Sequence, residues 1–188
     1  MPAYIETFNY ILAIGTVLLQ FTIVYIVFNL IFLRKKENYT LSFFKKNTIL
    51  FSFLIALSGL VLSLFYSDVI GYPPCELCVV QRFFIYPQAL FFGLALYIKK
   101  NYLIIIGTLL AFIEIFIAIY HVYVENGGES NLPCASDAIN AVTCNARYVH
   151  EFGYVTIPVM ALTTALFVVV LYLNNKFYKQ DYFINKTL

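Results

Sequence analysis

Charged side chains are scarce in this sequence. Asp, Glu, Lys and Arg make up 12% of the 188 residues, while 62% are hydrophobic and the mean hydropathy is +0.82. Soluble domains carry about 25% charged residues, so this composition excludes a water-soluble chain and indicates an integral membrane protein. The sequence also lacks tryptophan and a glycine-rich dinucleotide-binding fingerprint. Tyrosine and phenylalanine must therefore form any interfacial aromatic belt, and a bound dinucleotide is not expected.

Five apolar runs are long enough to cross a bilayer. A spanning helix needs roughly 20 mostly apolar residues to cross about 30 Å of hydrocarbon. The first run ends in Arg34-Lys35-Lys36 rather than in a small-residue cleavage site, so it is interpreted as a retained span and not as a secretory signal. The sequence predicts an all-α membrane bundle with one sizeable loop at 123 to 153 and spans at about 8 to 33, 48 to 67, 79 to 98, 102 to 122 and 154 to 173.

Lysine and arginine gather on one side of this predicted topology. With five spans, the segments after the first, third and fifth spans share one face, and basic residues near span ends are retained in the cytoplasm. The N-terminus, residues 68 to 78 and the 123 to 153 loop should therefore lie outside, which places all four cysteines in a compartment that permits disulfides. The basic residues of the predicted cytoplasmic face are Arg34, Lys35, Lys36, Lys45, Lys46, Lys99, Lys100, Lys176, Lys179 and Lys186.

The four cysteines form two pairs. Cys75 and Cys78 form a C-x-x-C motif at the turn into the third span. A helix N-terminus favours a thiolate, and Cys78 is the better placed if the helix begins at about 78 or 79. Cys134 and Cys144 lie in the outer loop with nine residues between them, too many for a second zinc knuckle, so no metal is expected. Two static structural disulfides remain the alternative to redox exchange, although a small C-x-x-C ring is more easily reduced than a long bridge.

Arg82 lies one helical turn beyond Cys78, inside an otherwise apolar run. An ionised group at the rim of the hydrocarbon is costly unless it snorkels to the surface or meets a partner. Spacing of four residues places Arg82 on the same helix face as Cys78. A cation there favours a thiolate and also stabilises negative charge that develops on the oxygen of an electron acceptor. Plain snorkelling is the alternative.

These residues carry a family resemblance. The segment Cys75-Glu76-Leu77-Cys78-Val79-Val80-Gln81-Arg82 resembles the C-x-L-C-x-x-Q-R signature of the disulfide bond formation protein B (DsbB) family, and more closely its BdbC-like branch. The resemblance covers about residues 48 to 174, so the additional span and basic linker in residues 1 to 47 have no counterpart in the family's core, and residues 175 to 188 form a tail. Other similar segments are Tyr86-Pro87, Tyr120-His121-x-Tyr123, Pro133-Cys134 with Cys144, and Phe152-Gly153-Tyr154-x-Thr156-Ile157-Pro158.

The resemblance implies a quinone-dependent protein-disulfide oxidoreductase of the bacterial cytoplasmic membrane. Its fold would be a four-helix bundle with one additional N-terminal transmembrane helix. A reduced DsbA-like protein of the thioredoxin fold would attack the Cys134–Cys144 disulfide from outside, most readily at Cys134, and Cys144 would then exchange with Cys75. Cys78 would meet a membrane quinone, either ubiquinone or menaquinone, beside Arg82. The implied partners are this thioredoxin-fold protein, the quinone and membrane lipid, with no nucleic acid.

Two ionisable residues of the fourth span have roles that the sequence leaves open. The family places a histidine close to the quinone, so His121 is a candidate quinone contact, although a wetted helix end is an equal alternative. Glu114 lies two turns deeper on the same face. An intramembrane carboxyl is a functional hypothesis by default, and a hydrogen bond between helices is the simpler interpretation.

Two other functions compete with thiol oxidation. Vitamin K epoxide reductase-like enzymes are also quinone-linked, but they place their loop cysteines before the C-x-x-C motif, which comes first in this chain. A disulfide-stapled membrane scaffold without redox turnover needs neither Arg82 nor exchange between the two pairs. Loss of thiol oxidation on replacement of Cys78 would exclude the scaffold.

Overall fold

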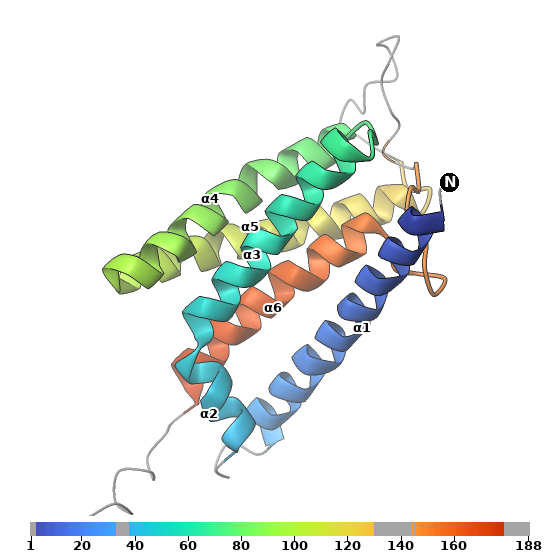
Figure 1. The fold of residues 1–188 in the computed structure, drawn as a ribbon. Coiled ribbons are helices and arrows are strands. Elements are labelled where there is room, and N and C mark those ends of the chain that lie inside the picture. Colours follow the sequence, from blue (N-terminus) through green and yellow to red (C-terminus); the bar gives the residue numbers. More distant parts are fainter. Residues whose placement is uncertain (1–2, 33–37, 130–143, 145, 179–188) are drawn as a thin grey trace, which may run out of the picture.

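The computed structural model describes residues 3–32, 38–129, 144 and 146–178 (Figure 1). Most of these residues are helical. The described part of the chain has no strand, and its one isolated bridge pairs Glu151 with Val155. The predicted all-α class is therefore confirmed.

Five helices are long and apolar enough to span a membrane, as the sequence predicted. A short helix, α2 (Tyr39–Lys46), follows the first of them, and a π-helical turn, η1 (Phe65–Val69), continues the second. The spans begin and end within a few residues of the expected positions, apart from α1, which begins at residue 3 instead of about 8. The five helices are α1 (Ala3–Phe32), α3 (Thr48–Leu64), α4 (Glu76–Ile98), α5 (Asn101–Glu125) and α6 (Ile157–Phe177).

Helices α3, α4, α5 and α6 form a closed four-helix bundle, because each packs against two of the others. Helix α1 lies outside this bundle and packs on α6 (Figure 1). Glycines allow close approach within the bundle. A Cβ atom at Gly107 of α5 would come within 2.8 Å of the Phe92 ring of α4, and one at Gly93 of α4 would come within 2.9 Å of the Phe53 ring of α3.

The connections that carry the cysteines lie at one end of the bundle. The N-terminal end of α1, the connection between η1 and α4, and the segment that enters α6 share this end (Figure 1). Helix α2, the turn between α4 and α5, and the end of α6 lie at the opposite end, with the described lysines Lys45, Lys46, Lys99, Lys100 and Lys176. The bundle thus separates the described cysteines from these lysines along its length.

Helix α4 begins earlier than the sequence predicted. Its first residue is Glu76, and Cys75 is its N-cap with extended backbone angles (φ −73°, ψ 167°). Pro73 and Pro74 precede the cap, and proline disfavours helix in the residue before it. The expected start at 78 or 79 is therefore wrong, and Cys75 rather than Cys78 occupies the capping position.

Candidate functional site

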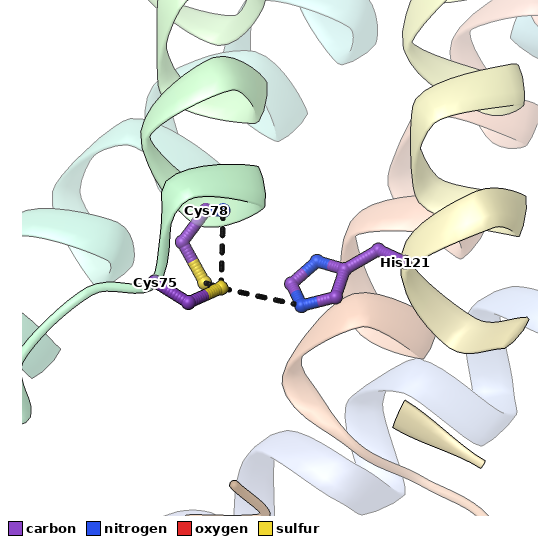
Figure 2. A group of neighbouring side chains, drawn as sticks. All are labelled: Cys75, Cys78 and His121. Carbon is purple, nitrogen blue, oxygen red and sulfur yellow. Dashed lines mark hydrogen bonds between the residues drawn. The ribbon is translucent and has the colours of Figure 1, made fainter. Parts of the chain in front are cut away.

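The two sulfurs of the C-x-x-C motif lie side by side at the start of α4. Cys75 Sγ and Cys78 Sγ are 3.1 Å apart and share a hydrogen bond (Figure 2). Cys75 Sγ also accepts a hydrogen bond from the Cys78 backbone N–H at 3.4 Å, as the N-cap position requires. The pair is described as two thiols and not as a disulfide. Oxidation to a disulfide needs only a small approach of the two atoms, because the helix start already directs both side chains to one place.

His121 approaches this pair from α5. Its Nε2 lies 3.5 Å from Cys75 Sγ (Figure 2). Its Nδ1 lies 3.2 Å from Gln81 Oε1 of α4. The amide oxygen can only accept, so Nδ1 carries the proton and donates it, and Nε2 presents its lone pair to the sulfur. The ring is 3% exposed. His121 can therefore take a proton from Cys75 without contact with bulk water.

The surroundings of Cys75 favour its protonated form. The hydrogen bond with Cys78, followed by burial, raises the pKa of the Cys75 thiol to about 12, and the bond to His121 partly opposes this. Cys75 therefore keeps its proton at neutral pH when the pair is reduced.

Cys144 joins the same group of buried residues. It packs with Cys75, Leu77 and Val124, and Cys78 lies against this cluster. Cys75, Cys78, His121 and Cys144 also line a small cavity of about 30 Å³. The predicted disulfide partner of Cys144 is Cys134, which lies outside the described residues. The fold thus brings the second cysteine of the loop pair to the C-x-x-C motif.

Arg82 is held by α3. Its Nε donates to Ser63 Oγ at 2.7 Å, and one terminal nitrogen donates to the Ser63 carbonyl oxygen at 2.8 Å. Both acceptors are neutral, so they orient the guanidinium and leave its positive charge uncompensated. Arg82 is therefore anchored between two helices and does not simply snorkel.

Arg82 and Cys78 line one large cavity of about 130 Å³. This volume is close to the roughly 150 Å³ of an apolar protein cavity that admits benzene. Gln81, which is 4% exposed, also lines it, and its Nε2 has no hydrogen-bond partner. A buried amide N–H that lacks a partner is costly, so a ligand oxygen in this cavity would satisfy it. The large cavity thus offers a cation, an amide donor and a sulfur to a ring-sized ligand that carries oxygen.

The predicted site residues divide between the two cavities. Cys78 borders both, whereas Arg82 borders the large cavity, and Cys75, His121 and Cys144 border the small one. His121 was a candidate quinone contact, with a wetted helix end as the equal alternative. The structure buries it beside Cys75, with Gln81 between it and the large cavity. Glu114 accepts a hydrogen bond from Gln88 Nε2 of α4 at 2.5 Å, the interhelical bond that the sequence favoured.

Sequence reasoning missed several residues of the site. Gln81 belongs to the family signature, but its bond to His121 depends on how α4 and α5 pack. Ser63 and Tyr148 carry no motif signal, although Ser63 holds Arg82 and Tyr148 borders both cavities. The sequence did not predict that the Tyr66 hydroxyl donates a hydrogen bond to Asn9 Oδ1 of α1 at 2.7 Å. Asn9, Ser63 and Tyr66 are polar residues near the cysteine-bearing ends of apolar spans, and this position is the sequence signal that could have pointed to them.

Comparison with known families decides the relationship. Residues 45–174 match the family described as disulfide bond formation protein DsbB. The chain belongs to the DsbB family. The matched region includes all four cysteines, Arg82 and His121, and it excludes α1. The family and its BdbC-like branch were predicted from the signature, and both are confirmed. As a member, the chain is a membrane protein of disulfide bond formation, with the thiol oxidoreductase character of its family.

Curated relatives agree with this assignment. The probable disulfide formation protein of Oceanobacillus iheyensis is 35% identical over 68% of this chain and 88% of its own length. The disulfide bond formation protein C of Bacillus subtilis is 35% identical over 66% of this chain and 91% of its own. A probable disulfide formation protein C 1 of Bacillus anthracis is 38% identical over 53% of this chain. No solved structure matches the chain.

Proposed function

We propose that this protein is a membrane thiol oxidase that carries electrons from an extracytoplasmic C-x-x-C protein to a membrane quinone. The observation that supports this most directly is the position of Cys78. Its side chain borders the small cavity, with Cys75 and Cys144, and the large cavity, with Arg82. A residue in both places can link thiol exchange on one side to an electron acceptor on the other.

The thiol side begins at the loop pair. A thiolate of a reduced DsbA-like partner attacks Cys134 of the Cys134–Cys144 disulfide and releases Cys144 as a thiolate, which attacks Cys75 and releases Cys78. The partner's second thiol then frees Cys134, and Cys134 displaces Cys75 from Cys144. The partner leaves oxidised, the loop disulfide is restored, and Cys75 and Cys78 are left reduced. The burial of Cys144 beside Cys75 supports the step between the two pairs.

The acceptor side is the large cavity. A quinone bound there would supply the acceptor for the two electrons and two protons that Cys75 and Cys78 release as they close their disulfide. Cys78 presents its sulfur to the cavity, Arg82 stabilises negative charge there, and Gln81 donates its free N–H to an oxygen. His121 Nε2, 3.5 Å from Cys75 Sγ, takes the proton that Cys75 gives up in this step. Ubiquinone and menaquinone both carry the ring and the carbonyl oxygens that these groups fit.

The proposal includes a location. The cysteine-bearing end of the bundle faces the outside of a bacterial cytoplasmic membrane, and the end with Lys45, Lys99 and Lys176 faces the cytoplasm. The separation of these groups along the bundle supports it, since basic residues are retained inside.

Replacement of Cys78 by serine tests the function. The purified variant is mixed with a reduced C-x-x-C partner and a soluble quinone, and partner thiols and quinone reduction are followed together. We expect both reactions to fall to the uncatalysed rate, because serine cannot form the disulfide that the quinone regenerates. Val79→Ser is the matched control, because Val79 is 51% exposed on the same helix turn and should keep its activity.

The scaffold alternative predicts a different result. A disulfide-stapled scaffold predicts that Cys78→Ser and Val79→Ser behave alike, with neither partner oxidation nor quinone reduction dependent on the protein. Partner oxidation that persists in Cys78→Ser would exclude Cys78 as the acceptor-side sulfur.

A further inference from the structure

We propose that the reduced Cys75–Cys78 pair and His121 together form a binding site for one thiophilic divalent cation such as Zn²⁺. The three donor atoms, two sulfurs and Nε2, lie within 4.8 Å of one another (Figure 2). The site is independent of the proposed electron transfer, because it depends only on the dithiol state of the pair.

The distances suit tetrahedral zinc. Bonds of about 2.3 Å to sulfur and about 2.0–2.1 Å to nitrogen place neighbouring sulfur and nitrogen ligands roughly 3.5 Å apart and two sulfurs roughly 3.8 Å apart. Cys75 Sγ is 3.5 Å from His121 Nε2, and the two sulfurs are 3.1 Å apart. A cation therefore needs the sulfurs to separate by a fraction of an ångström and Cys78 Sγ, which lies within 4.8 Å of Nε2, to come to roughly 3.5 Å from it. Rotation about the cysteine side-chain bonds supplies both movements.

Gln81 orients the His121 ring for metal binding. Metal-binding histidines usually donate their second ring N–H to an oxygen, which fixes the tautomer and the ring orientation. Gln81 Oε1 lies 3.2 Å from His121 Nδ1 and leaves the Nε2 lone pair directed at Cys75. Cysteine spacing disfavours only a site made of cysteines alone. The site proposed here takes its third ligand, His121, from another helix.

The small cavity provides room for the fourth ligand. Its volume of about 30 Å³ is bordered by all three donors, and a water molecule needs at least about 10–15 Å³. The cation would thus have two thiolates, one imidazole and one water, which is an open coordination sphere.

Metal binding and disulfide formation exclude each other at this site. The cation requires both sulfurs as thiolates and releases their protons, whereas the disulfide leaves neither sulfur as a thiolate. A bound cation therefore keeps the pair reduced and blocks the exchange of Cys75 with Cys144. The protein in its reduced state becomes a target for zinc inhibition.

Cobalt titration of the full-length protein in detergent tests the site, because thiolate-bound Co²⁺ absorbs visible and near-ultraviolet light. We expect one Co²⁺ per reduced chain, with displacement by Zn²⁺. The fully oxidised protein, which keeps the fold but lacks thiolates, should bind none. A reduced protein that shows no thiolate–cobalt absorption, or an oxidised protein that binds equally, would overturn the site.

Variants then assign the ligands. His121→Gln should weaken binding by more than the roughly 10- to 100-fold expected for loss of an outer contact, and Gln81→Leu should weaken it within that range. His150→Gln is the matched control, since His150 is the other histidine of the chain and is exposed. The double variant Cys134→Ser with Cys144→Ser should still bind one ion. Loss of binding in that double variant, or full affinity in His121→Gln, would place the metal elsewhere.

Discussion

At the scale of single residues, Cys78 is where the two cavities meet. It shares a hydrogen bond with Cys75 on one side and borders the cavity of Arg82 on the other. The reactivity of the reduced Cys75–Cys78 pair also depends on which of the two sulfurs keeps its proton. Cys75 keeps it, since Cys75 is hydrogen-bonded to Cys78 and is also buried.

The raised pKa of Cys75 predicts an unusual alkylation profile. In the reduced protein, the rate of Cys75 alkylation should keep rising with pH well past about 8.5, where an ordinary cysteine is half ionised. A raised pKa means that the reactive thiolate forms only at higher pH. Mass spectrometry of the modified peptide at each pH measures the rate.

Cys78→Ala provides the comparison for this profile. It removes the hydrogen bond that contributes most to the shift, so the half-point for Cys75 should move to lower pH. An unchanged profile would mean that access, and not the bond between the sulfurs, limits the reaction.

Arg82 gives the second prediction at this scale. Arg82→Gln should lower quinone-dependent kcat/KM by about 100-fold, the loss typical of a group that stabilises developing negative charge. Oxidation of the partner in a single turnover, which uses the stored disulfides, should change little. Steady-state and single-turnover assays together separate these steps.

Ser63→Ala is the graded control for Arg82. It removes the hydroxyl acceptor but keeps the carbonyl acceptor and the charge, so its effect should be clearly smaller than that of Arg82→Gln. Equal losses in the two variants would indicate that Arg82 acts by holding α3 and α4 together.

At the scale of elements, apolar length was enough to predict the five spans, because in lipid a single run of about 20 residues satisfies its backbone groups within itself only as a helix. The motif likewise predicted that Cys75, Cys78 and Arg82 share one helix. It could not predict that His121 meets Cys75, since that contact depends on the rotation of α5 against α4. The start of α4 was misplaced because Cys75 was not recognised as a cap.

Close packing of α4 and α5 predicts a large effect from a small substitution. Gly107→Ala should destabilise the protein by about 1–3 kcal/mol, as overpacking does, because the new methyl group meets the Phe92 ring. Gly15→Ala in α1 has open space around its Cβ and should be neutral or slightly stabilising. Thermal unfolding in detergent compares the two, and equal effects would contradict the packing described.

At the scale of the whole molecule, the bundle holds the described cysteines at one end and the described lysines at the other. In a cysteine-free background, Asn126→Cys should react with a membrane-impermeant maleimide in intact cells, and Asn101→Cys should react only after permeabilisation. Both residues are exposed and lie at opposite ends of α5. The reverse labelling pattern would invert the orientation.

Helix α1 has a defined place in this arrangement although it lies outside the family match. Tyr154 donates a hydrogen bond to Gln20 Oε1 at 2.8 Å, and Gln20 Nε2 donates to Thr163 of α6 at 3.1 Å. Leu12 and the Asn9 partner Tyr66 border the large cavity. The additional helix thus forms part of the wall beside which Cys78 and Arg82 lie.

The central claim is that the C-x-x-C pair delivers two electrons directly to a quinone. Anaerobic titration of the fully reduced Cys134→Ser, Cys144→Ser variant with quinone, followed by peptide mapping, measures this step without the loop pair. The account predicts that one quinone is reduced for every two thiols lost, with a disulfide between Cys75 and Cys78. Thiols that survive an excess of quinone, while the quinone stays oxidised, would contradict it.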